Sequence, residues 1–298
     1  MLSRRSGSNG EGSADVVGFY EEKTGSIQYV AIDRSTRKAG LIDVVLDFEP
    51  ASGRTSTESA EEILEFVRGE GLEVAWILDT HPHADHFMAS SWLKEKLDAP
   101  TAIGERVKDV AKLWRDYYHM PDAFDPERDF DRLFADGDRF EIGNLPVRAI
   151  LSPGHTLASI TYIVGSDAAF VHDTLMHVDF GTARADFPGG SSRTLYRSLQ
   201  AILDLPAETR LFVGHDYGTD DRDEPAWEAT VAEHRNHNVH IGGGVSEEEF
   251  VKLRNDRDAT LGLPDRILFA LQVNLRGGRL PEPESDGYSY FKIPADRF

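Results

Sequence analysis

Short apolar runs alternate with longer amphipathic stretches along this chain. The short runs predict β-strands, and stretches in which apolar residues recur every three or four positions predict helices. The expected strands cover residues 16–20, 27–32, 41–46, 74–78, 101–103, 140–142, 147–151, 160–164, 168–171 and 211–213. The expected helices cover residues 59–68, 88–97, 105–118, 193–203, 226–238 and 246–258. From Gly277 onward, prolines at 281, 283 and 294 favour an extended tail.

Helix starts and domain limits can also be predicted. Ser59 with Glu62, and Ser246 with Glu249, have the Ser-x-x-Glu spacing of a capping box. The first residues are rich in Ser and Gly, so we expect residues 1–13 to form a disordered N-terminal tail. We find no internal repeat and no linker long enough to divide the rest. Residues 14–298 are therefore expected to form a single domain with a helical and extended C-terminal extension.

Residues of the types that bind metals follow four of the predicted strands. The run Thr80-His81-Pro82-His83-Ala84-Asp85-His86 comes directly after the apolar stretch at 74–78. Three further candidates each follow an apolar run of their own: His155, Asp173 and His215. Imidazole and carboxylate groups hold zinc and non-haem iron in proteins. A solvated polar loop would explain the first run alone, but four such strand ends favour one metal centre at a shared rim.

Composition narrows the partners and the compartment. The 298-residue chain has 52 acidic and 32 basic residues and a formal net charge of −20, which disfavours binding to nucleic acid. No apolar stretch approaches the roughly 20 residues that span a membrane, and no apolar core follows the basic N-terminus. We therefore expect a cytoplasmic protein with a small-molecule substrate. The absence of cysteine excludes disulfides, thiolate metal ligands and a thiol nucleophile.

The order His-x-His-x-Asp-His, followed by His155, Asp173 and His215, resembles the metallo-β-lactamase fold superfamily. This resemblance implies an α/β fold, an αββα sandwich with metals at the sheet edge. It also implies a first metal site, a second site and a bridging carboxylate. The first site would be His81, His83 and His155, the second Asp85, His86 and His215, and the bridge Asp173. The same residues allow a dinuclear zinc hydrolase or a mononuclear iron dioxygenase that uses His81, His155 and Asp173.

Other segments resemble the bacterial persulfide dioxygenase family. They are residues 179–190, 194–198, 214–217 and 271–276. The resemblance implies an enzyme that oxidises glutathione persulfide with dioxygen to sulfite and glutathione. It also suggests that the protein is a homodimer. It implies one Fe(2+) per subunit on His81, His155 and Asp173. The remaining candidates would be catalytic groups around the iron ligands and water: His83, Asp85, His86 and His215.

The resemblance also suggests residues on the substrate side. Arg184 matches the family's glutathione-binding arginine, and an ion pair with Asp186 or Asp179 is the alternative role. Tyr196 and Tyr217 are candidates for the pocket wall, or else packed aromatic residues. Relatives often have Cys where Ala185 stands, so any help from that thiol is missing in this chain.

A second function fits the same ligand set. A hydrolase of the glyoxalase II type would cleave a glutathione thioester with one or two Zn(2+). In a dinuclear form, four more residues would bind metal: His83, Asp85, His86 and His215. Zinc has no redox chemistry, so the identity of the metal separates the two functions.

Overall fold

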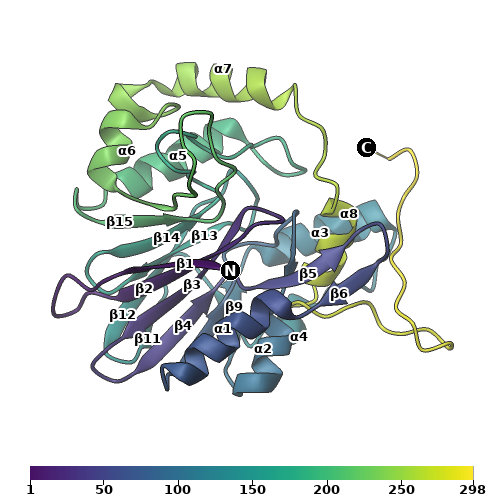
Figure 1. Ribbon diagram of the computed structural model, residues 1–298. Helices are drawn as coiled ribbons and strands as arrows, with labels where there is room; N and C mark the ends of the chain where they lie inside the picture. The colour runs from purple at the N-terminus through teal and green to yellow at the C-terminus, as the bar shows by residue number, and fades with distance from the viewer. Residues whose placement is uncertain (298) are drawn as a thin grey trace.

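Two β-sheets packed face to face form the centre of the molecule (Figure 1). The computed structural model describes residues 1–297. The first sheet has seven strands in the order β1-β2-β3-β4-β7-β9-β10. They are β1 Leu2–Ser6, β2 Asp15–Glu21, β3 Ser26–Asp33, β4 Lys38–Ile42, β7 Glu73–Leu78, β9 Thr101–Gly104 and β10 Arg132–Phe134.

The second sheet has six strands in chain order, from β11 to β16. They are β11 Arg139–Ile142, β12 Leu145–Leu151, β13 Ile160–Val164, β14 Ala168–His172, β15 Arg210–Val213 and β16 Glu228–Thr230. A small third sheet joins β6 Arg54–Ser56, β5 Val45–Glu49 and β8 Phe87–Met88. Most strands lie where the apolar runs predict them.

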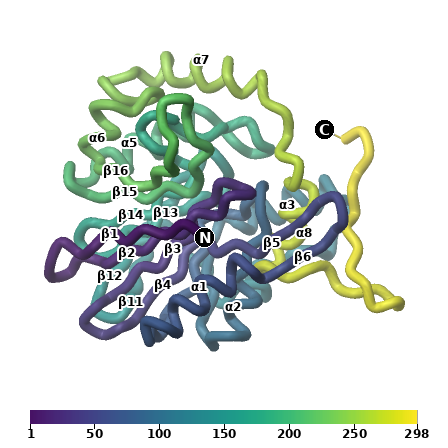
Figure 2. The backbone as a smooth tube through the Cα atoms, in the orientation of Figure 1, coloured from purple at the N-terminus to yellow at the C-terminus, as the bar shows by residue number. Residues whose placement is uncertain are grey.

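Helices cover the outer faces of both large sheets, which gives the expected layers of helix, sheet, sheet and helix (Figures 1 and 2). Beside the first sheet lie α1 Glu58–Gly69, α2 Ser90–Leu97, α3 Val107–Tyr118 and α4 Pro126–Asp129. Over the second lie α5 Ser192–Leu203, α6 Val231–His237, the 3₁₀ turn η1 Gly242–Gly244 and α7 Glu247–Asp258; α8 Ile267–Asn274 joins the group beside α3. Among the described residues, none of the helices has the length and apolar character needed to cross a membrane.

Alternating residues of the strands separate two apolar cores. On β3, Tyr29 and Ala31 face the second sheet, whereas Val30 and Ile32 pack on the helical side. The helical core includes residues of α1: Ala60, Ile63 and Val67. On the other side of the molecule, α5 contributes Leu195, Leu199 and Ile202. Strands β14 and β15 are buried along their whole length, and the candidate metal residues Asp173 and His215 follow their ends.

The expected disordered tail is wrong in its first part. Leu2–Ser6 form β1, an edge strand that pairs antiparallel with β2 along its whole length. Arg5 adds an ion pair with Asp15 at 3.0 Å, and Arg4 donates to the carbonyl of Pro225 at 2.7 Å. The partners of this segment lie elsewhere in the chain, so its own Ser- and Arg-rich composition does not reveal the strand.

Two element boundaries also differ from the prediction. The apolar run at 41–46 is split between β4 and β5, because Asp43 turns the chain with a φ of 52°. The helix expected from residue 226 begins only after β16, where Thr230 and Glu233 form a capping box for α6. In both cases a polar residue ends one element and starts the next inside a stretch that looked continuous.

One of the two predicted capping boxes is confirmed. Ser246 accepts from the N–H of Glu249, whose carboxylate accepts from the N–H of Ser246. At the other position the prediction is wrong, since Thr57 is the N-cap of α1. The N–H and hydroxyl of Ser59 both donate to the Asp47 carboxylate at 2.9 Å.

The extended C-terminal tail is confirmed over the described residues that follow α8 (yellow in Figure 2). Gln272 of α8 pins it, because its amide donates to the carbonyl of Lys292 and accepts from the N–H of that residue, both at 3.1 Å. Phe291 packs against Phe48 and Phe269. The tail therefore adds to the helical core. Helix α8 itself is not among the predicted helices.

Buried His234 on α6 predicts a dependence of stability on pH. Burial, with His177 adding, lowers the pKa of His234 to about 4, although Glu233 opposes this shift. The unfolded chain takes up this proton near the ordinary pKa of 6.5, so stability falls as the pH drops from 6.5 toward 4. The loss reaches up to about 3 kcal/mol. Urea unfolding at pH 7 and pH 4.5 should show a smaller loss for His234→Gln than for the parent, and equal losses would contradict the account.

Candidate metal centre

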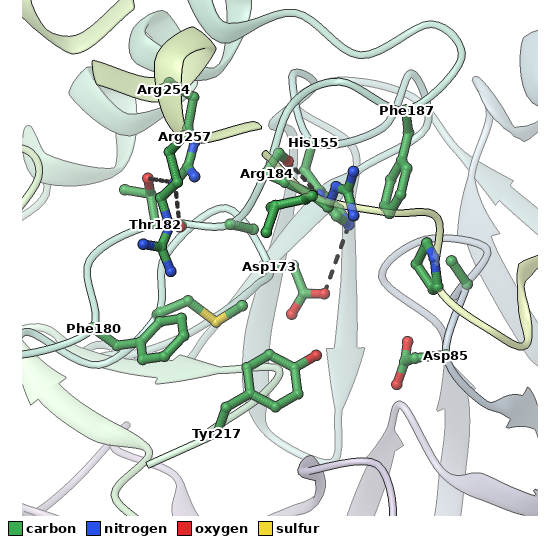
Figure 3. Close-up of a pocket in the computed structure, with 15 residues that line it drawn as sticks. Asp85, His155, Asp173, Phe180, Thr182, Arg184, Phe187, Tyr217, Arg254 and Arg257 are labelled. Carbon is green, nitrogen blue, oxygen red and sulfur yellow. Dashed lines mark hydrogen bonds and ion pairs between the residues drawn. The ribbon is translucent and has the colours of Figure 1, made fainter. Parts of the chain in front are cut away.

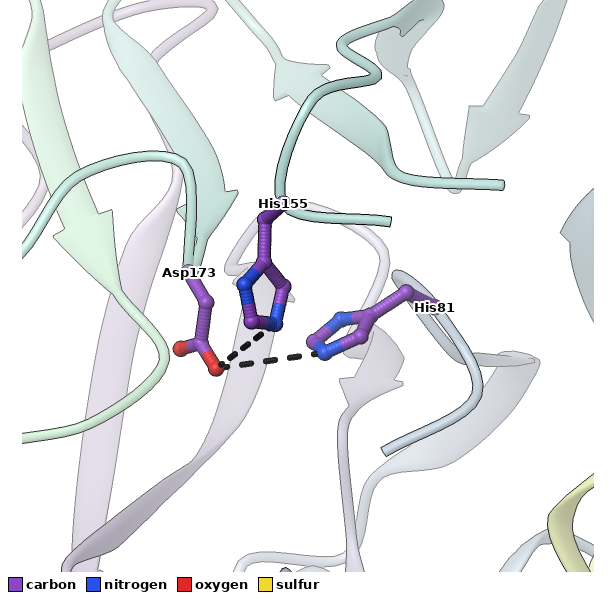
Figure 4. A group of neighbouring side chains, drawn as sticks. All are labelled: His81, His155 and Asp173. Atoms are coloured by element: carbon purple, nitrogen blue, oxygen red, sulfur yellow. Dashed lines mark ion pairs between the residues drawn. The ribbon is translucent and has the colours of Figure 1, made fainter. Parts of the chain in front are cut away.

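Four loops meet where the ends of the two large sheets adjoin. β14 and β15 are parallel neighbours, with His172 opposite Val213, so Asp173 and His215 emerge side by side. The loop after β7 brings His81, and the turn between β12 and β13 brings His155. One ligand atom from each of His81, His155 and Asp173 lies within 4.8 Å of the others (Figure 4). We call these three residues the trio.

Each histidine of the trio is oriented through its Nδ1 atom. His81 Nδ1 lies 3.0 Å from the Thr80 hydroxyl, and His155 Nδ1 donates to the carbonyl of Arg184 at 2.8 Å. The Nε2 atoms then face the carboxylate of Asp173, with distances to Oδ2 of 3.9 Å for His81 and 3.6 Å for His155 (Figure 4). Such bonds to the outer nitrogen fix the tautomer of a metal-binding histidine.

The protonation states of the trio suit a divalent cation. Burial lowers the pKa of His81 well below its usual value, with His83 adding, and burial also lowers the pKa of His155. Burial by itself would raise the pKa of Asp173, but the charge and hydrogen bond of His215 outweigh it and hold the pKa below the ordinary value. Neutral imidazoles and an ionised carboxylate are the forms that bind a metal. The donor set therefore fits zinc or iron(II).

His215 is bonded at both ring nitrogens. Its Nδ1 lies 2.6 Å from Asp173 Oδ1, and its Nε2 lies 2.7 Å from Asp85 Oδ2. Burial opposes a charge on the ring, yet the two carboxylates raise the pKa of His215 well above its usual value. Each ring nitrogen of His215 therefore faces a carboxylate oxygen, and these two contacts link the trio to Asp85.

A second group of ligand atoms lies next to the trio. His83, Asp85 and His86 have ligand atoms within 4.8 Å of one another. His86 Nε2 is buried and has no hydrogen-bond partner among the described residues, which is unusual for a buried polar atom. His83 Nε2 lies 3.1 Å from Asp43 Oδ1, on the side of the loop that Asp43 supports. Both ring nitrogens of His83 are also buried without a hydrogen-bond partner among the described residues, so the second group could hold a cation as well.

The loop that carries these histidines is held from two sides. Asp43 accepts the N–H and the hydroxyl of Thr80, both at 2.8 Å. Asn274 of α8 donates to the carbonyls of His83 at 2.8 Å and His86 at 2.9 Å. Through Asn274, the segment at 271–276 positions the backbone of the loop that carries the metal residues. This contact gives a physical reason why the segment is part of the resemblance to the persulfide dioxygenases.

A cavity of about 280 Å³ opens beside the trio (Figure 3). Three residues of the metal groups reach it: Asp85, His155 and Asp173. Apolar side chains form much of its wall: Met176, Phe180, Phe187, Leu261 and Pro264. Three arginines line it as well: Arg184, Arg254 and Arg257. A molecule bound here would place a reacting atom at the trio and the rest of its body along a mixed apolar and cationic wall.

The predicted substrate residues divide between the cavity and the interior. Tyr217 lines the cavity, and its ring stacks on His215 with 5.6 Å between centroids. Tyr196 is not among the lining residues, because its hydroxyl donates to the carbonyl of Val245 and its ring packs on Phe250. The expectation that Tyr196 lines the pocket is wrong, and its alternative as a packed aromatic residue holds.

Arg184 lines the cavity but has its guanidinium in use. Nε and Nη2 each bond one carboxylate oxygen of Asp186, at 2.6 and 2.7 Å, and Nη1 donates to the carbonyl of Gly262 at 2.7 Å. Neighbouring Ala185 is buried, and its N–H donates to Asp258 of α7 at 2.9 Å. The ion pair with Asp186 was the alternative expected from the sequence, and the structure contains it.

Several residues around the site have no motif in the sequence. Asp43 and Thr80 support the metal loop. Arg254 and Arg257 reach the cavity from α7, and the pattern of apolar residues along that helix does not predict this position for them. Asp43 is the one acidic residue inside the apolar run at 41–46, and this interruption is a sequence signal that could have pointed to it. The α7 arginines could be found only from the contacts between distant segments.

Comparison with known proteins assigns the family. The model of the Metallo-beta-lactamase superfamily matches residues 44–215, which is more than half of the chain. The matched stretch contains every candidate metal residue named above. The chain belongs to the metallo-beta-lactamase superfamily, and its fold is the metallo-beta-lactamase fold, as the sequence predicts.

Curated relatives cover nearly the whole chain. The Beta-lactamase hydrolase-like protein of Xylella fastidiosa is 55% identical over 94% of this chain, and the chain spans 64% of that protein's length. Glyoxylase B2 of Dictyostelium discoideum is 43% identical over 93% of this chain and 95% of its own. The persulfide dioxygenase ETHE1 of Bos taurus is a more distant relative, 29% identical over 87% of each chain.

Among solved structures, the crystal structure of ETHE1 from Myxococcus xanthus is similar over nearly the whole molecule. Its TM-score is 0.70 at 27% identity, and the match covers 94% of this chain and 100% of that one. The predicted resemblance to the persulfide dioxygenases is confirmed as a distant relationship.

Proposed function

We propose that the protein is a mononuclear iron dioxygenase that oxidises glutathione persulfide to sulfite and glutathione. The observation that carries the proposal is the geometry of the trio. Two histidine Nε2 atoms and one carboxylate oxygen converge beside a cavity, and each ring is oriented by its own Nδ1 bond. Two imidazoles and one carboxylate, with positions left open, are typical of non-haem iron oxygenases. The relationship to persulfide dioxygenases in sequence and structure supports the same assignment.

Contacts within the protein favour one metal over two. Both ring nitrogens of His215 lie close to a carboxylate oxygen, at 2.6 and 2.7 Å. His83 Nε2 lies 3.1 Å from Asp43 Oδ1, a carboxylate outside the trio. These contacts support the trio as the ligand set of a single metal.

When bound on the trio, iron(II) supplies coordination positions for dioxygen and for the persulfide sulfur. In the overall reaction the outer sulfur gains two oxygen atoms from dioxygen and one from water, and the S–S bond breaks. Glutathione leaves as the thiol, and two protons are released. Met176, Phe180 and Phe187 give the substrate an apolar wall, and His215 connects Asp173 to Asp85 through its two ring nitrogens.

A zinc hydrolase is the second candidate function, because His83, Asp85 and His86 also converge. The 43% identity to Glyoxylase B2 favours this reading as well. In that case a glutathione thioester would occupy the same cavity, and His215 would have to give up its two carboxylate partners. Tyr217 and the apolar wall would serve both substrates.

Reconstitution with one metal at a time tests the proposal. Metal-free protein is loaded with Fe(2+) without oxygen, or with Zn(2+), and each form is assayed with glutathione persulfide and with S-lactoylglutathione. We expect one iron per chain, and oxidation of the persulfide by the iron form alone. Two zinc ions per chain with rapid cleavage of the thioester would instead establish the hydrolase.

A further inference from the structure

One wall of the cavity is formed by the end of α7 and the loop that follows it. Arg254 and Arg257 lie three positions apart on this helix, so they share a face, and Leu261 and Pro264 continue the wall. Figure 3 shows Arg254 and Arg257 together at one side of the cavity, across from Asp85. Helix α7 therefore brings two guanidinium groups to a cavity whose other side reaches the metal residues.

Two of the three cavity arginines already have carboxylate partners. Arg184 is paired with both oxygens of Asp186. Arg254 is only 1% exposed, and its Nη2 lies 2.9 Å from Asp258. Both side chains also donate to backbone carbonyls, so neither guanidinium is free to hold a ligand without breaking bonds that shape the wall.

Arg257 differs from both of them. Its side chain is exposed at the cavity, and the guanidinium makes no hydrogen bond or ion pair with any residue that the structure describes. Of the cavity arginines within residues 1–297, it is the one whose charge no carboxylate neutralises. In a chain with a net charge of −20, such a site locally favours an anion that the rest of the surface repels.

We propose that Arg257 binds a carboxylate of the substrate at the cavity mouth and thereby selects persulfides carried on an anionic peptide over those of small neutral thiols. The proposal rests on the proposed function and names the residue that would recognise its substrate. A planar guanidinium binds a carboxylate through two parallel hydrogen bonds. The apolar side chains that line the same cavity suit the carbon skeleton of such a ligand.

The test compares Arg257→Gln with Lys252→Gln, a control that removes one positive charge from the same helix outside the cavity. Binding of S-methylglutathione is measured by calorimetry, and turnover of glutathione persulfide is compared with that of 2-mercaptoethanol persulfide, which has no carboxylate. For Arg257→Gln we expect about tenfold weaker binding of S-methylglutathione and a similar rise in KM for glutathione persulfide, with kcat unchanged. The neutral persulfide should be turned over as in the parent, and Arg257→Lys should lie between the two.

The outcomes separate this inference from the proposed function. Unchanged affinity and KM in Arg257→Gln would overturn it, as would an equal loss in Lys252→Gln, since a long-range charge effect would then suffice. If no form of the protein oxidises any persulfide but Arg257→Gln still loses S-methylglutathione, the proposed function fails and the carboxylate site stands. Both substitutions are on the exposed surface, and urea unfolding checks that the variants are folded.

Discussion

Replacing Asp173 with alanine is expected to remove iron binding and to lower persulfide oxidation by at least about a hundredfold. Loss of a mere neighbour of a metal ligand costs about 10- to 100-fold in affinity or activity, and Asp173 is the one carboxylate of the trio. Its other oxygen also lies 2.6 Å from His215 Nδ1, so the substitution leaves that buried ring with one partner fewer. Iron analysis of the purified variant and dioxygen uptake measure both effects.

Asp179→Asn is the matched control for that substitution. Asp179 lies in the same part of the chain and pairs with Arg222 at 2.7 Å, but it belongs to none of the metal groups among the described residues. It should keep one iron per chain and most of the turnover. An Asp173→Ala variant that binds one iron per chain and remains active would show that the trio is not the metal centre.

The second large effect concerns the buried pair between Arg254 and Asp258. Asp258→Ala should lower the free energy of unfolding by about 3–5 kcal/mol, because it leaves a buried guanidinium without its counter-charge. Arg254 is 1% exposed and Asp258 4% exposed, and the carboxylate also accepts the N–H of Ala185 at 2.9 Å. Since Arg254 donates to the carbonyl of Thr182 at 2.8 Å, the cavity wall at residues 182–185 should loosen as well.

A double variant separates loss of the charge partner from loss of packing. Arg254→Met with Asp258→Leu removes both charges and keeps apolar volume, so it should recover much of the stability lost in Asp258→Ala. Urea unfolding of the parent, the single variant and the double variant gives the comparison. A loss below about 1 kcal/mol in Asp258→Ala would mean that water or a rearranged side chain compensates the guanidinium.

The sequence predicts that the candidate metal residues come together because their signal is local. Each of His81, His155, Asp173 and His215 lies within a few residues of the end of an apolar run, and buried strands must end where polar residues begin. The pairing of β14 with β15 then brings the last two together. The layers of the fold follow from the same alternation of strands and helices.

The remaining features depend on contacts between segments far apart in the chain. Neither the two carboxylate contacts of His215 nor the ion pair of Arg184 can be predicted from spacing in the sequence, since each requires a partner to be placed within hydrogen-bond distance. In the sequence, nothing distinguishes Arg257 from other arginines, and only the packing of α7 beside the cavity does so. Strand β1 could not be predicted for the same reason, because the hydrogen bonds that stabilise it come from β2.

The stoichiometry of dioxygen uptake by the iron-loaded protein tests the proposed dioxygenase activity directly. Glutathione persulfide is added to anaerobically prepared protein in buffer with a known oxygen content, and dioxygen, sulfite and glutathione are measured together. We expect one dioxygen to be consumed for each sulfite and each glutathione formed, and no uptake by the zinc-loaded form. Absence of uptake from protein shown to hold one iron per chain would contradict the proposed activity and favour the thioester hydrolase.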